Sequence, residues 1–332
     1  MGAIVPLRVA ESDASRYLAS CGLRRIYQGK VRDTYSYPVE PELLLPLATD
    51  RVSIFDFVLS ALIPRKGEVL TALTHFWLTT VLRDFPNHLA PAEELLRLKR
   101  MFSQLPMERC LVVKRAEIRP YEMIFRHHLG GSVYKEYLGT GTAGGNELPK
   151  RLTKWSFLEE PIFTPTTKEE RGHDKPIPAQ EYFEQTGEAG RQAEAMFRAA
   201  YGRAYAFGRS RGILILDTKF EGRDMIADEV LTPDSSRFTT EEDFVLAMAQ
   251  KRDPIFFDKQ VVRDWGVEVQ TPWGKGIGNL DAKNPEHIAF VHSLEVPAEV
   301  VKETAIRYFS IFSSLTSWDI DAYQWMRRDV WV

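Results

Sequence analysis

One stretch of the chain, GILILDTKFE at residues 212–221, constrains the fold more than any other. Its aliphatic run ILIL is typical of a strand inside a sheet, and alternation along the strand would place Asp217, Lys219 and Glu221 on one face. Gly222 and the two residues after it are typical of a turn, and MIADEVLT at 225–232 would return as the second strand of a hairpin. The chain is therefore expected to build a sheet around a hairpin that carries several charges.

The register of this hairpin decides what its charges can do. With the turn centred on residues 223–224, Lys219 would lie opposite Asp228, and Glu221 would be a diagonal neighbour of Asp228. Two carboxylates that close raise each other's pKa unless a cation lies between them, and Mg²⁺ or Mn²⁺ commonly bridges carboxylates to nucleotide phosphates. The alternative is a solvent-facing edge with ordinary surface ion pairs. A slip of one residue would turn the two carboxylates apart.

Three further segments carry charges suited to an anionic ligand. The turn-forming segment TPDSSR at 232–237, taken alone, is typical of an ordinary polar loop, but after the carboxylates of the hairpin its Asp234 and Arg237 also suit an anion, since arginine matches the geometry of phosphate. Gly29-Lys30-Val31-Arg32 lacks the spacing of a Walker A loop, so it is either a hairpin turn whose amides approach phosphates or a solvated basic turn. Lys114 follows the apolar run CLVV, which predicts a buried strand, and a buried lysine needs an anionic partner.

Other polar residues are compatible with a site without specifying one. They stand at an expected strand end (residues 48–56), before a Gly-Gly-Ser turn (130–132) and on a proline-rich loop (161–178). The candidates in these segments are Ser53, Asp56, Arg126, Ser132, Lys168 and Asp174. A structural role is equally compatible with each, and for the loop residue His173 a structural or solvated role is the favoured interpretation.

Length and composition exclude several classes of protein. A chain of 332 residues suits two lobes, and its 44% hydrophobic and 27% charged residues are ordinary for a soluble globular protein. The net charge of −3 gives no basic field for nucleic acid or an anionic membrane. With only Cys21 and Cys110, no signal sequence and no long apolar run, we expect a cytoplasmic protein with small-molecule ligands.

The predicted organisation is α+β. A strand-rich lobe is expected over residues 1–120 and a mixed lobe over 121–332, with residues 266–295 as a probable insertion. Apolar residues at helical spacing predict helices at about 71–85, 187–211, 239–252, 257–264 and 297–314.

Eight segments in order resemble the phosphoribosylaminoimidazole-succinocarboxamide synthase (SAICAR synthetase) family. They are GKVRDTY (29–35), ATDRVSIFDFVL (48–59), IPRKGEVLTALTHFW (63–77), GGSVYKEY (130–137), PIFTPTTKEERGHD (161–174), LDTKFE (216–221), DEVLTPDSSRF (228–238) and FDKQVVRDW (257–265). The resemblance implies a two-lobed fold related to ATP-grasp and kinase-like nucleotide binders, with the active site in the cleft between the lobes.

The resemblance also implies an ATP-dependent C–N ligase of de novo purine biosynthesis. Such an enzyme condenses carboxyaminoimidazole ribonucleotide (CAIR) with L-aspartate through an acyl phosphate, giving SAICAR, ADP and phosphate. The implied cofactors are ATP and Mg²⁺, and the implied assembly is a monomer or a homo-oligomer.

Roles carry over to the positions that match the family pattern. The implied ATP-binding residues are Gly29, Lys30, Val31, Arg32, Lys114 and, through the backbone of residues 115–118, Glu117. The implied Mg²⁺ ligands are Glu221 and Asp228, which thereby contact the nucleotide. The implied catalytic residues are Asp217, Lys219 and Arg237, and the implied substrate-binding residues are Ser53, Asp56, Arg126, Ser132, Lys168, Asp174, Asp234 and Arg237.

The chain departs from the family pattern at His127, His128, Gly130 and Lys175. These departures leave open a change in the amine or carboxylate accepted, with the ATP chemistry kept. Two alternatives therefore stay open: a divergent paralogue that joins another carboxylate and amine, and a nucleotide-binding module without turnover. Retention of both proposed metal carboxylates disfavours the second.

Overall fold

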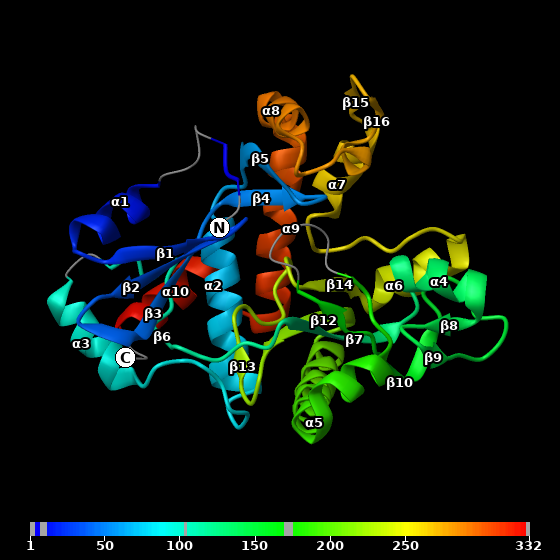
Figure 1. The fold of residues 1–332 in the computed structure, drawn as a ribbon, viewed down its shortest axis with the longest axis horizontal. Helices are drawn as coiled ribbons and strands as arrows, with labels where there is room; N and C mark the ends of the chain where they lie inside the picture. The colour runs from blue at the N-terminus through cyan, green and yellow to red at the C-terminus, as the bar shows by residue number, and fades with distance from the viewer. Residues whose placement is uncertain (1–3, 7–11, 103–104, 169–174, 330–332) are drawn as a thin grey trace. The chain divides into compact units, whose positions relative to one another are not determined.

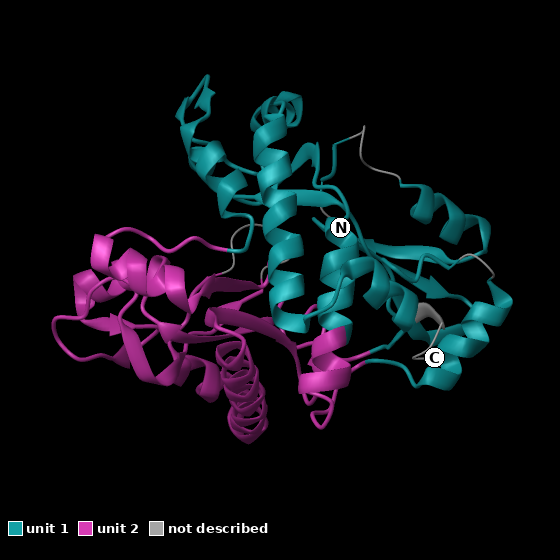
Figure 2. Cartoon of the chain, turned by 180° about the vertical axis from the view of Figure 1, so that it is seen from behind, with its two compact units in different colours: residues 1–75, 89–115, 257–332 teal, residues 76–88, 116–256 magenta. Residues whose placement is uncertain are grey.

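The computed structural model describes residues 4–6, 12–102, 105–168 and 175–329 (Figure 1). The chain packs as two compact units (Figure 2): the first contains residues 1–75, 89–115 and 257–332, and the second contains residues 76–88 and 116–256. This division differs from the one expected at residue 120, because the C-terminal helices pack with the N-terminal strands.

An antiparallel sheet in the order β1-β2-β3-β6 organises one part of unit 1. Its strands are β1 (Arg24–Gln28), β2 (Arg32–Tyr37), β3 (Glu40–Ala48) and β6 (Val113–Lys114), and its core also takes side chains from α1 (Asp13–Ser20) and α3 (Ala92–Met101). Alternate residues of β3, Leu43, Leu45 and Leu47, are buried in this core. The strand, turn and strand predicted around Gly29 are confirmed.

The prediction that Lys114 lies inside a buried strand is wrong. The strand β6 has only two residues, is the last strand in the order of the sheet, and has beyond β3 a single bridge from Val113 to Leu89. Val113 faces the core, while Lys114, on the opposite face, is exposed to solvent and needs no buried partner.

The rest of unit 1 is built on the hairpin of β4 (Arg51–Ile54) and β5 (Phe57–Leu62). Residues Val52, Ile54 and Leu59 of this hairpin share a core with Ile277 and Val291. The predicted insertion at 266–295 is therefore part of the core of unit 1. The elements around this hairpin are α2 (Lys66–Phe76), α7 (Gln260–Glu268), β15 (Gln270–Thr271), β16 (Gly274–Lys275), a 3₁₀ turn (Ile277–Asn279), α8 (Pro285–Ser293), α9 (Ala298–Thr316) and α10 (Ile320–Asp329).

Unit 2 contains a six-stranded antiparallel sheet with β12 at its centre. The path runs β10-β7-β12-β13, β11 also pairs with β7, and β14 also pairs with β12. The strands are β7 (Tyr121–His128), β10 (Phe157–Phe163), β11 (Thr166–Thr167), β12 (Ile213–Gly222), β13 (Ile226–Ala227) and β14 (Ser236–Thr240). Nine of the ten residues of β12 are buried, Lys219 being the exception, so the prediction of an interior strand is confirmed.

The long helix α5 (Ala179–Ser210) packs against β12 and β7 (Figure 1). The remaining elements of unit 2 are a π-helical turn (Trp77–Val81), α4 (Ser132–Thr140), the short hairpin of β8 (Thr142–Ala143) and β9 (Asn146–Glu147), and α6 (Glu241–Gln250). All five predicted helices are present, with boundaries that shift by several residues. Within the described residues, no helix combines the length and the apolarity needed to cross a membrane.

Candidate active site

The hairpin of β12 and β13 has a different register from the predicted one. Glu221 pairs with Ala227 and Gly222 with Ile226, so the turn holds three residues and the prediction is wrong by one residue. Gly222 permits this turn, because its φ is +148° and a Cβ there would lie 2.0 Å from the carbonyl oxygen of Met225. The strand β13 then ends at once, and Asp228 has a left-handed backbone conformation with φ +58°.

Asp228 nevertheless lies close enough to β12 to act on its charges. Burial would lower the pKa of Lys219, but the carboxylates of Glu221, Glu122 and Asp228 outweigh burial and hold it well above the ordinary value. Burial and Asp228 both raise the pKa of Glu221, yet the lysine ammonium groups beside it lower the net value. The lysine and the carboxylate are therefore both charged at neutral pH.

We call this group, Glu122, Lys168, Lys219, Glu221 and Asp228, the acidic cluster. Glu221 accepts hydrogen bonds from Lys168 and Lys219, and the Lys219 Nζ lies 3.0 Å from a carboxylate oxygen of Glu122. Three carboxylates thus face two ammonium groups, leaving a formal excess of one negative charge. Among the residues that the structure describes, no three His, Cys, Asp or Glu side chains form a metal site by themselves.

A second group of charges lies on three adjacent strands of the same sheet. Arg126 on β7 and Arg237 on β14 both stand opposite Asp217 on β12. Both guanidinium groups bind the Asp217 carboxylate, Arg237 through an Nε that lies 3.0 Å from Oδ1. Burial lowers the pKa of Arg126 and Asp217 opposes that effect. Two arginines on one carboxylate leave a positive charge that suits an anionic ligand.

The helix α4 begins beside this arginine pair. Its N-cap residue is Gly131, whose φ is +65°, and no side chain caps the first turn. A Cβ on Gly131 would lie 3.0 Å from an Nη atom of Arg237, so glycine allows the backbone to approach the guanidinium. Ser132 is the exposed first residue of the helix. Free backbone amides and a guanidinium side by side favour an anion at this position.

In unit 1, the turn after β1 is held by a residue that the sequence analysis did not select. Arg51 is 2% exposed, donates to the carbonyl oxygens of Gly29 (2.9 Å) and Lys30 (3.2 Å), and binds Asp33 at 2.5 Å. A Cβ on Gly29 would lie 2.7 Å from the carbonyl oxygen of Arg32, so the tight turn requires glycine. Lys30 forms an ion pair with Asp56, which brings two predicted site residues together.

A family model described as SAICAR synthetase matches residues 25–280. The chain belongs to the SAICAR synthetase family. The phosphoribosylaminoimidazole-succinocarboxamide synthase of Actinobacillus succinogenes is 39% identical over 310 residues, which covers 90% of this chain and all of the relative.

Solved SAICAR synthetases share the fold. The SAICAR synthase of Saccharomyces cerevisiae, solved in complex with SAICAR, matches with a TM-score of 0.70 and 30% identity over 90% of this chain and 96% of its own. A SAICAR synthetase solved in complex with ADP matches with a TM-score of 0.58 and 18% identity over 88% of this chain and 98% of its own, a likeness of fold alone. The comparisons thus establish the mixed α/β fold and the ligase class of this family member.

Other predicted site residues lie outside the two charged groups. Ser53 is buried in β4, Asp234 is half-buried in the turn before β14, and Glu117 is exposed and paired with Arg223. Arg32 begins β2, and the carbonyl oxygen of Val31 accepts hydrogen bonds from Thr49. Asp174 and His173 lie outside the described residues.

The departures from the SAICAR synthetase pattern near Arg126 have a packing reason. His127 stacks on Tyr205 with ring centroids 4.0 Å apart, and burial lowers its pKa to about 4. His128 Nδ1 lies 3.1 Å from the carbonyl oxygen of Trp155. Gly130 is required where it stands, because a Cβ there would lie 1.8 Å from the ring of Trp155. The residues near Arg126 that depart from the family pattern are therefore those that pack against aromatic rings at the end of β7.

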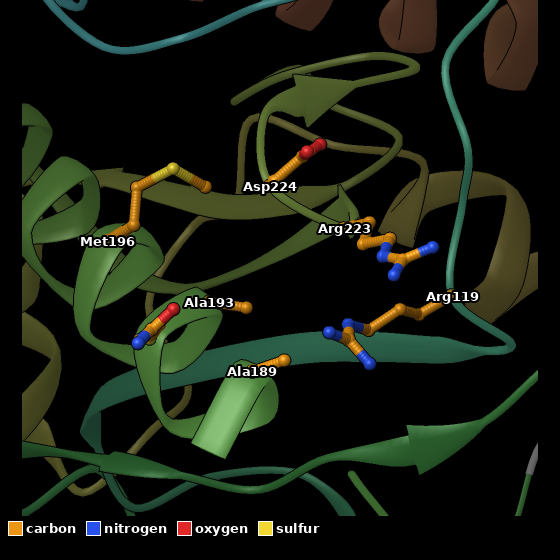
Figure 3. A pocket seen from close by; sticks show the side chains of 7 residues that line it. Arg119, Ala189, Ala193, Met196, Arg223 and Asp224 are labelled. Atoms are coloured by element: carbon orange, nitrogen blue, oxygen red, sulfur yellow. The ribbon is translucent and has the colours of Figure 1, made fainter. Parts of the chain in front are cut away.

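Unit 2 also holds a pocket of about 360 Å³, which is lined by residues of α5, by Arg119 and by the turn of the β12–β13 hairpin. In Figure 3, Ala189, Ala193 and Met196 line it from α5, while Arg119 and Arg223 lie along another side. Its lining contains none of the predicted catalytic, metal or substrate residues.

Proposed function

We propose that this member of the SAICAR synthetase family condenses CAIR with L-aspartate at the expense of ATP, giving SAICAR, ADP and phosphate. The observation that carries the proposal is the charged face of β12, where Asp217, which binds the arginine pair, is followed at alternating positions by Lys219 and Glu221 of the acidic cluster. One group suits a metal and the other suits an anion, and a phosphorylating ligase needs both.

Glu221 and Asp228 are the proposed Mg²⁺ ligands. Their hard oxygen donors fit this ion, which commonly takes one or two protein carboxylates together with substrate phosphates. The fit is supported by the charge balance, since Asp228 raises the pKa of Glu221 and an added cation would relieve that repulsion. When bound, Mg²⁺ would neutralise charge on the transferred phosphoryl group.

The arginine pair is the proposed binding site for the anionic groups of the nucleotide substrate. Arg126 and Arg237 are already oriented by Asp217, so little side-chain freedom is lost when an anion binds. Ser132 at the start of α4 adds a hydroxyl and backbone amides. Asp217, Lys219 and Arg237 would orient the reacting carboxylate, with Asp234, Ser53, Asp56, Lys168 and Asp174 as further substrate-binding residues.

The proposed ATP-binding residues are Lys30 and Arg32 for the phosphates, with Gly29, Val31 and Lys114, and the backbone around Glu117 for the adenine. The turn held by Arg51 supports this role, because its amides and its lysine keep a fixed position before a ligand arrives. The relation of the fold to ATP-grasp and kinase-like nucleotide binders, an active site in the cleft between lobes, and a cytoplasmic location belong to the same proposal.

The proposed reaction has two steps. An oxygen of the imidazole carboxylate attacks the γ-phosphorus of ATP, and ADP leaves. The amine of aspartate then attacks the carbonyl carbon of the acyl phosphate, loses a proton, and expels inorganic phosphate. A free carboxylate is a poor electrophile, so the phosphoryl group supplies the leaving group, and the protein contributes positioning and charge neutralisation.

An ADP-release assay with CAIR, in the presence and absence of aspartate, tests this proposal. We expect ADP and SAICAR in equal amounts when all three substrates are present. A preference for another amine over aspartate would identify a divergent paralogue. Absence of ADP release with every carboxylate and amine pair would identify a binding module and contradict the proposal.

A further inference from the structure

Trp155, which the sequence analysis did not select, lies beneath the guanidinium of Arg237. The Cζ atom of Arg237 is 5.1 Å from the centroid of the Trp155 ring. This separation is within the range of a cation–π contact, for which tryptophan is the best aromatic partner. Arg237 is therefore held on two sides, by the Asp217 carboxylate and by the indole face.

The indole ring is itself fixed. Trp155 is 3% exposed and packs with Leu214, Leu216 and Phe256 in one core cluster. Its Nε1–H donates to the Asp253 carboxylate at 2.8 Å, so the ring cannot turn without losing a hydrogen bond. A buried, hydrogen-bonded ring is a rigid support for a side chain as long as arginine.

Two glycines make room for this stack. A Cβ at Gly130 would overlap the Trp155 ring at 1.8 Å, and a Cβ at Gly131 would lie 3.0 Å from Arg237. The absence of a side chain at residue 130 therefore leaves room for the indole, and its absence at residue 131 leaves room for the guanidinium. The backbone of Trp155 is also unusual, because its φ is +67°. Non-glycine residues hold such conformations only where the surrounding contacts impose them, and these cluster at functional sites.

We propose that Trp155 is a positioning residue for Arg237 and thereby sets the affinity for the anionic nucleotide substrate. This inference rests on the role of Arg237 in the proposed function. Trp155 holds the guanidinium in place before the substrate arrives, so the substrate does not have to order a free arginine side chain. Its removal lowers affinity for the nucleotide substrate and leaves the affinity for ATP unchanged.

The test is a double-mutant cycle of Trp155→Leu and Arg237→Met, read out as the KM for CAIR, the KM for ATP and the melting temperature. We expect Trp155→Leu to raise the KM for CAIR roughly tenfold, with an unchanged KM for ATP. In the Arg237→Met background the same change should have no further effect on that KM. Trp155→Phe, which keeps an aromatic face and a core side chain, should give an intermediate KM even where Trp155→Leu folds poorly.

The matched control is Trp325→Leu, since Trp325 is 53% exposed on α10 and has no place in the proposed site. It should change neither KM. A purely structural Trp155 would lower the melting temperature and act equally in both Arg237 backgrounds, which overturns the inference and leaves the proposed function intact. If Arg237→Met itself leaves the KM for CAIR unchanged, the assigned role of Arg237 and the inference both fail.

Discussion

Lys219 is the side chain on which the charge balance of the acidic cluster depends. It contacts Glu122 and Glu221, and the repulsion between Glu221 and Asp228 is offset largely by its ammonium group. Lys219→Met should therefore raise the pKa of Glu221 and misplace the reacting carboxylate.

We expect Lys219→Met to lower kcat/KM for CAIR by about 100-fold or more, while the Kd for ADP changes much less. Steady-state kinetics and calorimetric titration with ADP measure the two effects. An equal loss of ADP affinity would instead place Lys219 in nucleotide binding.

Asp228→Asn isolates the proposed metal site, because asparagine keeps the size of the side chain and removes its charge. Turnover should fall by about 100-fold or more, and a higher Mg²⁺ concentration should be needed for half-maximal rate. The matched control is Asp224→Asn in the exposed turn of the same hairpin, which should keep normal kinetics. An Asp228→Asn enzyme with ordinary Mg²⁺ dependence would contradict the metal assignment.

For single residues, the sequence predicted the buried strand β12 and the alternation of its charges better than it predicted the contacts of those charges. Alternation along β12 correctly placed three charges on one face, since period-two geometry is local. The hairpin register was wrong because a three-residue turn cannot be told from a two-residue turn by composition. Trp155 and Arg51 were missed because each acts on residues far along the chain.

The proposed ligand-binding element of unit 1 is the turn between β1 and β2, and its stability depends on a buried ion pair. Asp33 is fully buried and binds Arg51, which also donates to two carbonyl oxygens of the turn. Replacing Arg51 removes the hydrogen-bonded partner of the buried Asp33 carboxylate and leaves it with Arg25 alone, whose Nη1 lies 3.8 Å away.

Arg51→Met should therefore lower the free energy of unfolding of unit 1 by about 3–5 kcal/mol, as measured by urea denaturation. The control is Arg16→Met, whose ion pair with Asp13 is exposed and should change stability by less than about 0.5 kcal/mol. A loss at Arg51 as small as the loss at Arg16 would show that the turn does not need this pair.

The buried His127 at the end of β7 leads us to expect that the stability of the protein depends on pH. Burial, with His128 and Arg198 nearby, lowers the pKa of His127 from 6.5 to about 4 in the folded protein. Between these values the unfolded chain binds a proton that the folded protein does not, so stability falls as pH falls from about 6.5 to about 4. His75 and His128 act in the same direction, because burial lowers the pKa of each.

His127→Phe keeps the stack on Tyr205 and Phe157 but removes this titration. The slope of stability against pH in that window should become shallower by at most about 1.4 kcal/mol per pH unit, as measured by urea denaturation at several pH values. An unchanged slope would mean that the pKa of His127 is the same in the folded and the unfolded protein.

For the whole molecule, the sequence predicted the family and a fold that mixes helices and strands, but not which segments form each unit. The eight family segments are local and ordered, so they can be recognised from the sequence alone. The packing of residues 257–332 in unit 1 cannot be recognised in this way, because the apolar face of α9 has the same pattern whichever core it joins. The place of the segment 266–295 in the core could not be predicted either, because nothing in the sequence near Ile277 and Val291 indicates which residues they pack against.

The proposed roles of β12 and its neighbours all serve the formation of an acyl phosphate. An oxygen label follows this step directly. CAIR with ¹⁸O in its carboxylate is converted with ATP and aspartate, and the phosphate and SAICAR are analysed by mass spectrometry. Transfer of one carboxylate oxygen to phosphorus predicts one ¹⁸O in each released phosphate and the other in the new amide. Unlabelled phosphate, formed together with SAICAR, would contradict the mechanism.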